Sequence, residues 1–89
     1  MNIEYDPKKD ASNFAKHGVL LSLAQELEWD MLLATEDLRN DYGEIRWIGY
    51  APIKDRVYCV VFTERNEVRR IISLRKANRR EVKNYVNQI

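Results

Sequence analysis

Cationic side chains are concentrated in one stretch near the C-terminal end, residues 69–83. Seven of its fifteen residues are Arg or Lys, and Glu81 is its only acid. The cations are Arg69, Arg70, Arg75, Lys76, Arg79, Arg80 and Lys83. Guanidinium groups form paired hydrogen bonds to phosphate or carboxylate oxygens, so this run favours a polyanionic partner. The alternative is a solvated surface whose cations neutralise Glu64, Glu67 and Glu81.

The charge is also divided unevenly between the two halves of the chain. Residues 1–44 carry ten acids and four bases, a net charge of −6, whereas residues 45–89 carry four acids and eleven bases, a net charge of +7. The formal total of +1 hides this asymmetry. Such a separation points to nucleic acid or to an acidic protein as the partner.

Glu44 and His17 are the candidates for proton transfer. Glu44 and Arg46 are two positions apart, so in a strand they would face one side and could supply a base and a phosphate-binding cation. A surface ion pair is the alternative. His17, the only histidine, could protonate a leaving group or simply favour the end of a helix. With one histidine, one cysteine and no Gly-rich phosphate loop, no metal or cofactor is expected.

The N-terminal third is predicted to contain a short strand and two helices. Residues 2–6 alternate apolar and polar side chains, as in an edge strand. A helix follows and ends at Gly18, which suits the left-handed terminating position. Ser22 and Gln25 then have the spacing of a capping box, so a second short helix is expected to run to about Trp29. The end of the first helix carries the histidine.

The rest of the chain is predicted to be antiparallel sheet followed by one helix. Strands are expected over residues 31–35, 46–50, 57–63 and 67–74. The third of these is the most apolar and should lie centrally, and Arg65 and Asn66 suggest a tight hairpin turn. Asn78 and Glu81 again have capping-box spacing, predicting a helix to Ile89 that packs back on the sheet. The expected fold is α+β, with two N-terminal helices, a sheet of four to five strands and a C-terminal helix in one domain, residues 1–89.

Four aromatic residues lie near the predicted strands. They are Trp29, Trp47, Tyr50 and Tyr58. If exposed, such rings could stack on unpaired RNA bases. Because strand alternation buries most such side chains, we expect most of them in the core and one or two beside the basic surface.

The composition fits a cytoplasmic protein. The single cysteine, Cys59, lies in an apolar run and cannot form an internal disulfide. The first six residues lack the basic start and apolar stretch of a signal peptide, and no apolar run approaches the ~20 residues that span a bilayer. A soluble location without a membrane partner is therefore expected.

Four strings in this order resemble the BrnT family of type II toxins. They are Ile3-Glu4-Tyr5-Asp6-Pro7-Lys8-Lys9; Asn13 with Lys16-His17-Gly18-Val19; Gly43-Glu44-Ile45-Arg46-Trp47-Ile48-Gly49; and Arg70-Ile71-Ile72-Ser73-Leu74-Arg75-Lys76-Ala77 with Glu81 and Tyr85. Each string is weak alone, but their order over nearly the whole chain is specific. Leu74 stands where the family usually has alanine, and Ile45 where it often has glutamate.

The resemblance implies a RelE-like toxin fold and endoribonuclease activity that inhibits translation. It also implies a BrnA-type antitoxin that forms a hetero-oligomer with the toxin and whose own module binds DNA, so any contact of this chain with DNA would be indirect. The family positions place the RNA site on Glu44, Arg46, Arg70, Arg75 and Arg79, with Lys16 and His17 in support. The alternative is a basic domain that only binds nucleic acid or an antitoxin.

RNA cleavage without a metal needs a base, cations for the charge that develops on the phosphate, and an acid for the leaving oxygen. We expect Glu44 as the base, Arg46, Arg70 and Arg75 as charge stabilisers, and His17 or a second arginine as the acid. The residues expected to bind RNA are Lys16, Lys76, Arg79 and Arg80. Because Arg70 and Arg75 are five positions apart, they would face opposite sides of a flat strand. A bulge or the end of the strand must bring them to one face.

Overall fold

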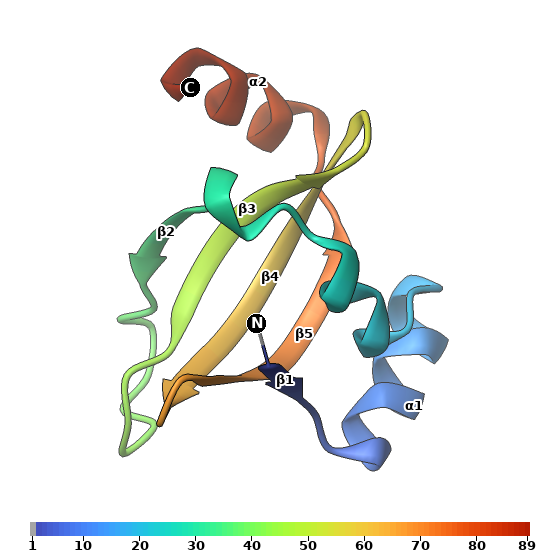
Figure 1. Ribbon diagram of the computed structural model, residues 1–89, viewed down its shortest axis with the longest axis vertical. Helices are drawn as coiled ribbons and strands as arrows, with labels where there is room; N and C mark the ends of the chain where they lie inside the picture. Colours follow the sequence, from blue (N-terminus) through green and yellow to red (C-terminus); the bar gives the residue numbers. More distant parts are fainter. Residues whose placement is uncertain (1) are drawn as a thin grey trace.

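The computed structural model describes residues 2–89, which form a five-stranded mixed sheet flanked by helices (Figure 1). The elements in chain order are β1 (Asn2–Glu4), α1 (Pro7–His17), the 3-10 helices η1 (Leu21–Glu26) and η2 (Trp29–Met31), β2 (Leu33–Glu36), β3 (Trp47–Ile53), β4 (Arg56–Arg65), β5 (Val68–Lys76) and α2 (Arg79–Gln88). The strand order is β1-β5-β4-β3-β2, with β4 in the centre. The predicted α+β class and the central position of β4 are confirmed.

The sheet was predicted to be antiparallel, but one of its strand pairs is parallel. β1 runs parallel to β5, with Ile3 opposite Arg69, whereas β2, β3, β4 and β5 pair antiparallel in sequence order. The alternation of apolar residues identifies β1 as a strand, but it contains no information about strand direction. The direction of β1 relative to β5 depends on the path that the chain takes between these two strands.

The predicted second short helix, running to about Trp29, is not found as one helix, because residues 21–26 and 29–31 form two separate 3-10 helices. η1 begins at Leu21, and within residues 2–89 its N-cap residue Leu20 forms no side-chain capping hydrogen bond. Ser22 and Gln25 therefore lie inside the helix, and Ser22 is not the residue that starts it. Leu21, Ala24 and Leu27 recur at every third residue, which is the period of a 3-10 helix. All three are buried against the sheet, so burial of this stripe favours the tighter helix.

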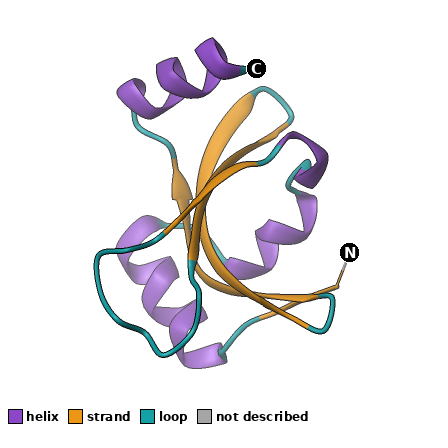
Figure 2. Ribbon diagram, turned by 90° about the vertical axis from the view of Figure 1, so that its left-hand side faces the viewer, coloured by secondary structure: helices purple, strands orange, loops and turns teal. Residues whose placement is uncertain are grey.

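η1 and η2 cover one face of the sheet, which we call the covered face. The hydrophobic core lies between these two helices and the sheet. Leu21, Val60, Ile71 and Leu74 are fully buried there. Burying each such side chain contributes about 1.5–3 kcal/mol. Figure 2 shows the 3-10 helices on one side of the sheet and the loop of residues 37–46 projecting from the other. That loop joins β2 to β3, and we call it the β2–β3 loop.

α1 closes the edge of β5 beyond the end of β1. It begins after Asp6, whose carboxylate accepts a hydrogen bond from the backbone N of Lys8, and ends at Gly18 with φ 71°. β1 pairs with residues 68–70 of β5, and within residues 2–89 no strand continues along that side of β5; its other side pairs with β4. The buried Asn13 amide donates to the carbonyl of Leu74 at 2.8 Å, and its Oδ1 accepts from the Leu74 N–H at 3.2 Å. Asn13 thus replaces a neighbouring strand and holds the end of α1 beside β5.

A β-bulge in β5 sets which face its side chains occupy. Phe62 pairs with Ile71, but the preceding residue of β4, Val61, pairs with Ser73. Ile72 is therefore the extra residue of a bulge, and it shifts the alternation of β5 by one position.

The bulge brings Arg70 and Arg75 to the same face. Arg70 lies opposite Thr63 and Arg75 lies opposite Cys59, and these two residues of β4 point to one side of the sheet. The prediction that a bulge or strand end must reconcile the two arginines is confirmed. We call this side, which η1 and η2 do not cover, the open face.

α2 confirms the predicted capping box but not the predicted packing. Asn78 Oδ1 accepts from the Glu81 N–H at 2.8 Å, and Glu81 Oε1 accepts from the Asn78 N–H at 2.9 Å. The helix lies beyond one end of the sheet instead of across a face (Figure 1). Tyr85 is buried, whereas Val86 is exposed. The helical period identifies residues that share one side of a helix, but it does not indicate whether that side meets the sheet. None of the helices in residues 2–89 has the length and apolar character needed to cross a bilayer.

Candidate functional site

Three of the predicted site residues, Lys16, His17 and Arg75, line one depression of about 410 Å³ on the open face. We call it the basic depression. Its other lining residues are Arg39, Ile48, Tyr50, Cys59, Val61, Ser73 and Glu81. The end of α1 supplies the histidine and β5 supplies Arg75, so the depression depends on the Asn13 hydrogen bonds and on the bulge. Three cations and one carboxylate line it.

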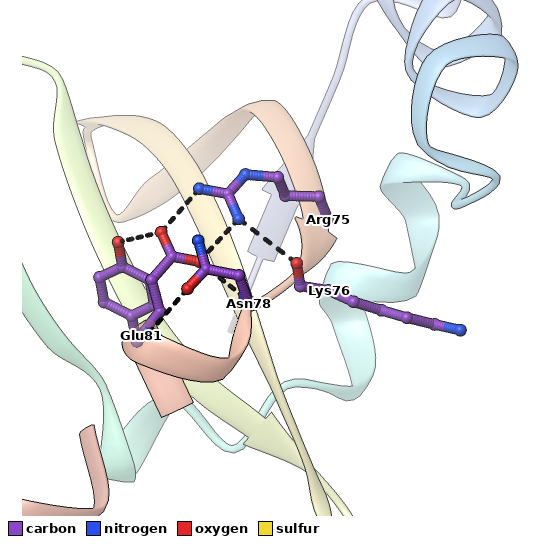
Figure 3. Close-up of polar contacts among 5 residues, drawn as sticks. Arg75, Lys76, Asn78 and Glu81 are labelled. Atoms are coloured by element: carbon purple, nitrogen blue, oxygen red, sulfur yellow. Dashed lines mark hydrogen bonds and ion pairs between the residues drawn. The ribbon is translucent and has the colours of Figure 1, made fainter. Parts of the chain in front are cut away.

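Arg75 is held in this depression by Glu81. Arg75 Nη1 donates to Glu81 Oε1 at 2.8 Å, and Nη2 donates to Oε2 at 2.9 Å (Figure 3). The same carboxylate also accepts from the Asn78 N–H at 2.9 Å and from the Tyr50 hydroxyl at 3.0 Å. Hydrogen bonding to Arg75 is the main cause that lowers the pKa of Glu81 to about 2. Glu81 thus joins β3, β5 and α2 at one point.

One edge of the Arg75 guanidinium remains open. A guanidinium has five N–H donors. Glu81 takes two of them, and the carbonyl of Lys76 takes a third at 3.3 Å. The Nε–H and the second Nη2–H form no hydrogen bond within residues 2–89, and they point along the same edge. Arg75 can therefore remain bound to Glu81 while it donates two hydrogen bonds to a phosphate.

The hydrogen bonds that the Glu81 carboxylate accepts, which we call the Glu81 network, are expected to stabilise the fold measurably. Glu81→Gln keeps the shape of the side chain but removes its charge, so the free energy of unfolding at pH 7 should fall by about 2 kcal/mol. That corresponds to a decrease in Tm of roughly 10 °C for a domain of this size. Because the pKa of Glu81 is depressed from 4.5 in the folded state, this stability is present above pH 4.5 and is lost as the pH falls towards 2.

The measurement is thermal unfolding of both proteins at pH 7 and at pH 2–3. Glu36→Gln removes one exposed carboxylate from β2 and serves as the matched control. If Glu81→Gln and Glu36→Gln unfold at the same temperature at pH 7, the network does not stabilise the fold.

His17 ends α1 beside two cations. Partial burial, Lys16 and Arg75 all lower the pKa of His17 below its ordinary value of 6.5, with burial the largest cause. A helix C-terminus alone would favour the protonated imidazole and raise this pKa. The surroundings outweigh the helix end, so His17 is mainly neutral at pH 7 and is able to accept a proton.

Glu44 and Arg70 lie in a second depression of about 210 Å³, further along the open face. Its lining consists of Glu4, Glu44, Thr63, Arg65, Val68 and Arg70. Glu44 forms an ion pair with Arg65 at 3.2 Å, and Arg70 forms one with Glu4 at 3.4 Å. The two depressions share no lining residue. Arg70 and Arg75 are separated by roughly 15 Å of strand, so one small ligand could not contact both.

The family comparison covers most of the chain. A model of the family described as "Ribonuclease toxin, BrnT, of type II toxin-antitoxin system" matches residues 5–81. The chain belongs to the BrnT family. The resemblance inferred from the sequence strings is confirmed, and membership implies an RNA substrate and an antitoxin partner. The chain matches none of the curated proteins with which it was compared.

Arg46 lies in neither depression of this BrnT-family chain. β3 begins at Trp47, so Glu44 and Arg46 belong to the β2–β3 loop and not to a strand. The prediction that they share one strand face is therefore wrong, because strand alternation does not apply in a loop. The Arg46 guanidinium stacks on Tyr42, with Cζ 4.0 Å from the ring centroid, and its buried Nε has no hydrogen-bond partner among residues 2–89.

The remaining cations of the run at residues 69–83 are distributed over both faces. Lys76 lies opposite Tyr58 and points to the covered face, away from Arg75. Arg69 also points there, stacks on Trp29 at 4.6 Å and pairs with Glu64 at 2.9 Å. The alternative interpretation, neutralisation of acids, is thus correct for Arg69 and partly for Arg75.

Arg79 and Arg80 are exposed in the first turn of α2. Cations are unfavourable at a helix start unless an anion shares the site. Glu81 supplies such an anion in this chain, because its carboxylate accepts the Asn78 N–H. Both arginines are therefore exposed in the turn of α2 that contains Glu81, which itself lines the basic depression.

The sequence patterns did not identify Arg39, Ser73 or the hydroxyl of Tyr50 as site residues of this BrnT-family chain. All three line the basic depression. Tyr50 is the aromatic residue that meets the expectation of a ring beside the basic surface, whereas Tyr58 is buried. Arg39 is the only Lys or Arg between residues 17 and 45. Its isolation in the acidic half of the chain is the one sequence feature that could have identified it as a site residue.

Proposed function

We propose that this BrnT-family chain is a metal-independent endoribonuclease that inhibits translation by cleaving RNA in its basic depression. The observation that carries the proposal is the convergence of His17, Lys16 and Arg75 at one depression on the open face. The proposal includes a RelE-like fold, as the family resemblance implies, together with one domain over residues 1–89 and a cytoplasmic location, as the length and composition favour.

In the proposed reaction, a ribose 2′-oxygen attacks the adjacent phosphorus. The O2′–P bond forms and the P–O5′ bond breaks, which leaves a 2′,3′-cyclic phosphate and a free 5′-hydroxyl. Neutral His17 takes the 2′-hydroxyl proton, and the open edge of Arg75 stabilises the added charge on the phosphoryl oxygens. Lys16, on the same depression, gives a proton to the leaving 5′-oxygen. These residues supply each proton and charge that the reaction needs.

This assignment differs from the one expected from the sequence. Glu44 was expected to be the base, but it lies with Arg70 in the second depression and pairs with Arg65. In this proposal His17 is therefore the base, whereas the sequence led us to expect it as the acid. Arg70, Arg79 and Arg80 are assigned to flanking phosphates, and Lys76 and Arg46 have no assigned contact.

The partner in this proposal is a BrnA-type antitoxin that covers the basic depression. Carboxylates of the antitoxin would interact with the same open guanidinium edge that binds RNA, and they would exclude RNA sterically. The resting state would be a hetero-oligomer, and DNA would be contacted only through the antitoxin.

Induction of the chain alone is expected to slow growth and to cleave cellular RNA, because no antitoxin then blocks the basic depression. Co-expression with the adjacent gene should restore growth and intact RNA. Growth curves and RNA gels at matched levels of soluble protein measure both effects, with His17→Gln as the inactive control. Normal growth and intact RNA with abundant soluble wild-type protein would refute the proposed function. RNA that is bound but left intact by the purified protein would favour the non-catalytic alternative.

A further inference from the structure

The β2–β3 loop brings a second arginine, Arg39, to the basic depression. Arg39 Nε donates to Asp37 Oδ1 at 2.8 Å, and Arg39 Nη2 donates to Asp37 Oδ2 at 2.8 Å. The side chain of Arg39 is 66% exposed, whereas that of Asp37 is fully buried. An exposed arginine is thus attached by two hydrogen bonds to a carboxylate inside the loop.

Asp37 is held more firmly than a surface ion pair would be. Its carboxylate also accepts from the backbone N–H of Arg39 at 3.1 Å and from the Tyr42 hydroxyl at 3.1 Å. Its own backbone N–H donates to the carbonyl of Arg46 at 2.7 Å, which closes the loop at its base. Exposed ion pairs usually contribute little because their side chains stay mobile. Here the anchor is buried and hydrogen-bonded on both oxygens, so the guanidinium plane of Arg39 is fixed.

The two arginines of the depression are held in complementary ways. Asp37 occupies the Nε and Nη2 edge of Arg39, which leaves the edge formed by Nη1 and Nη2 open. Glu81 occupies the Nη1 and Nη2 edge of Arg75, which leaves the Nε and Nη2 edge open. Each guanidinium is therefore fixed by a carboxylate through one edge and presents a second pair of donors. Such donors match the oxygens of a phosphodiester.

We propose that Arg39 and Arg75 form a two-arginine clamp for an RNA phosphodiester, with Asp37 as the residue that positions Arg39. This inference rests on the proposed function and adds a binding residue to it. The depression, at about 410 Å³, has the size of a small-ligand site and accommodates a phosphate with its sugar. Because both side chains are fixed before RNA arrives, binding requires little further ordering of either.

Binding of a short single-stranded RNA with 2′-O-methyl riboses tests the clamp, because this strand cannot cleave itself. Arg39→Gln should weaken binding roughly tenfold and should reduce the slope of log K against log salt by about 0.7. Arg39→Lys keeps the charge but lacks the two-edged planar group. A clamp predicts that Arg39→Lys binds almost as weakly as Arg39→Gln, whereas charge alone predicts wild-type affinity. Arg56→Gln removes an exposed arginine at the start of β4 and is the matched control.

Asp37→Asn gives a second readout of opposite sign. Removing an anion beside the depression should strengthen RNA binding if only charge matters. It should weaken binding if Asp37 positions Arg39. Thermal melting checks the folding of each variant, and the two exposed Arg39 variants decide the question if Asp37→Asn is unfolded.

The outcomes separate the clamp from the proposed function. If both Arg39 variants bind as Arg56→Gln does, while wild-type protein cleaves RNA and His17→Gln does not, the clamp is overturned and the proposed function stands. If Arg39→Lys retains wild-type affinity and Arg39→Gln does not, the clamp is also overturned, because a point charge suffices. If wild-type protein does not bind the 2′-O-methyl strand, the clamp and the proposed RNA site fall together.

Discussion

Arg75→Ala is expected to lower the rate of RNA cleavage by roughly 100-fold or more, as the loss of one preorganised donor does in comparable sites. The open Nε and Nη2 edge of Arg75 stabilises charge that develops on the phosphate during the reaction, so its loss raises the barrier. RNA affinity should fall much less, because Lys16 and the flanking arginines still attract the strand. The measurement is single-turnover cleavage with protein in excess, together with RNA affinity at the same salt concentration.

Arg70→Ala is the matched comparison for this prediction. Arg70 lies on the same strand and the same face as Arg75, but in the second depression. Its replacement should weaken RNA binding while bound RNA is still cleaved quickly. Because Arg75→Ala also removes the main partner of Glu81, folding must be confirmed by thermal melting. A large loss of rate in Arg70→Ala with normal cleavage by Arg75→Ala would move the reaction centre to the second depression.

The parts of the fold that were predicted correctly depend on local signals. Gly18 ends α1 because few other residues tolerate its positive φ, and Asn78 with Glu81 starts α2 through a reciprocal pair of hydrogen bonds. Both signals lie within a few residues of the backbone they control. The hairpin between β4 and β5 was also predicted from a local signal. Its turn is formed by Asn66 and Glu67, both with positive φ, one position later than predicted.

The parts that were predicted wrongly depend on contacts distant in sequence. The parallel direction of β1 is set by the path back to β5, and η1 is a 3-10 helix because Leu21, Ala24 and Leu27 are all buried. The sequence indicated that a bulge or the end of β5 must bring Arg70 and Arg75 to one face, but not which of the two or where. Ile72 takes that position in a register that only the pairing with β4 defines.

The candidate site was predictable to a similar extent. His17 and Arg75 were identified by residue type, and Asn13 then holds the end of α1 beside β5 so that both line one depression. Arg39 was missed because its position depends on the buried carboxylate of Asp37 within a long loop. Residue type alone gives no indication of which loop side chains return to a site.

His17→Gln is expected to reduce cleavage by roughly 100-fold to 10,000-fold, the usual contribution of a general base, with little change in RNA affinity. Because the neutral imidazole is the active form, the rate should rise with pH through the pKa of His17, which lies below 6.5. Arg75→Gln removes a positive charge that lowers this pKa. The rising limb should therefore move to higher pH in that variant, although its maximal rate is lower. As the only histidine, His17 can also be titrated directly by NMR.

Glu44→Gln distinguishes His17 from the base first expected from the sequence. Glu44 is exposed and pairs with Arg65 in the second depression, so its replacement should leave the cleavage rate close to that of the wild type. RNA binding should stay the same or become slightly tighter, because one anion is removed from the surface that the strand crosses. The measurement is single-turnover cleavage by both variants at several pH values. If Glu44→Gln is inactive while His17→Gln still cleaves, Glu44 is the base, and the chemistry takes place beside Arg70 instead of Arg75.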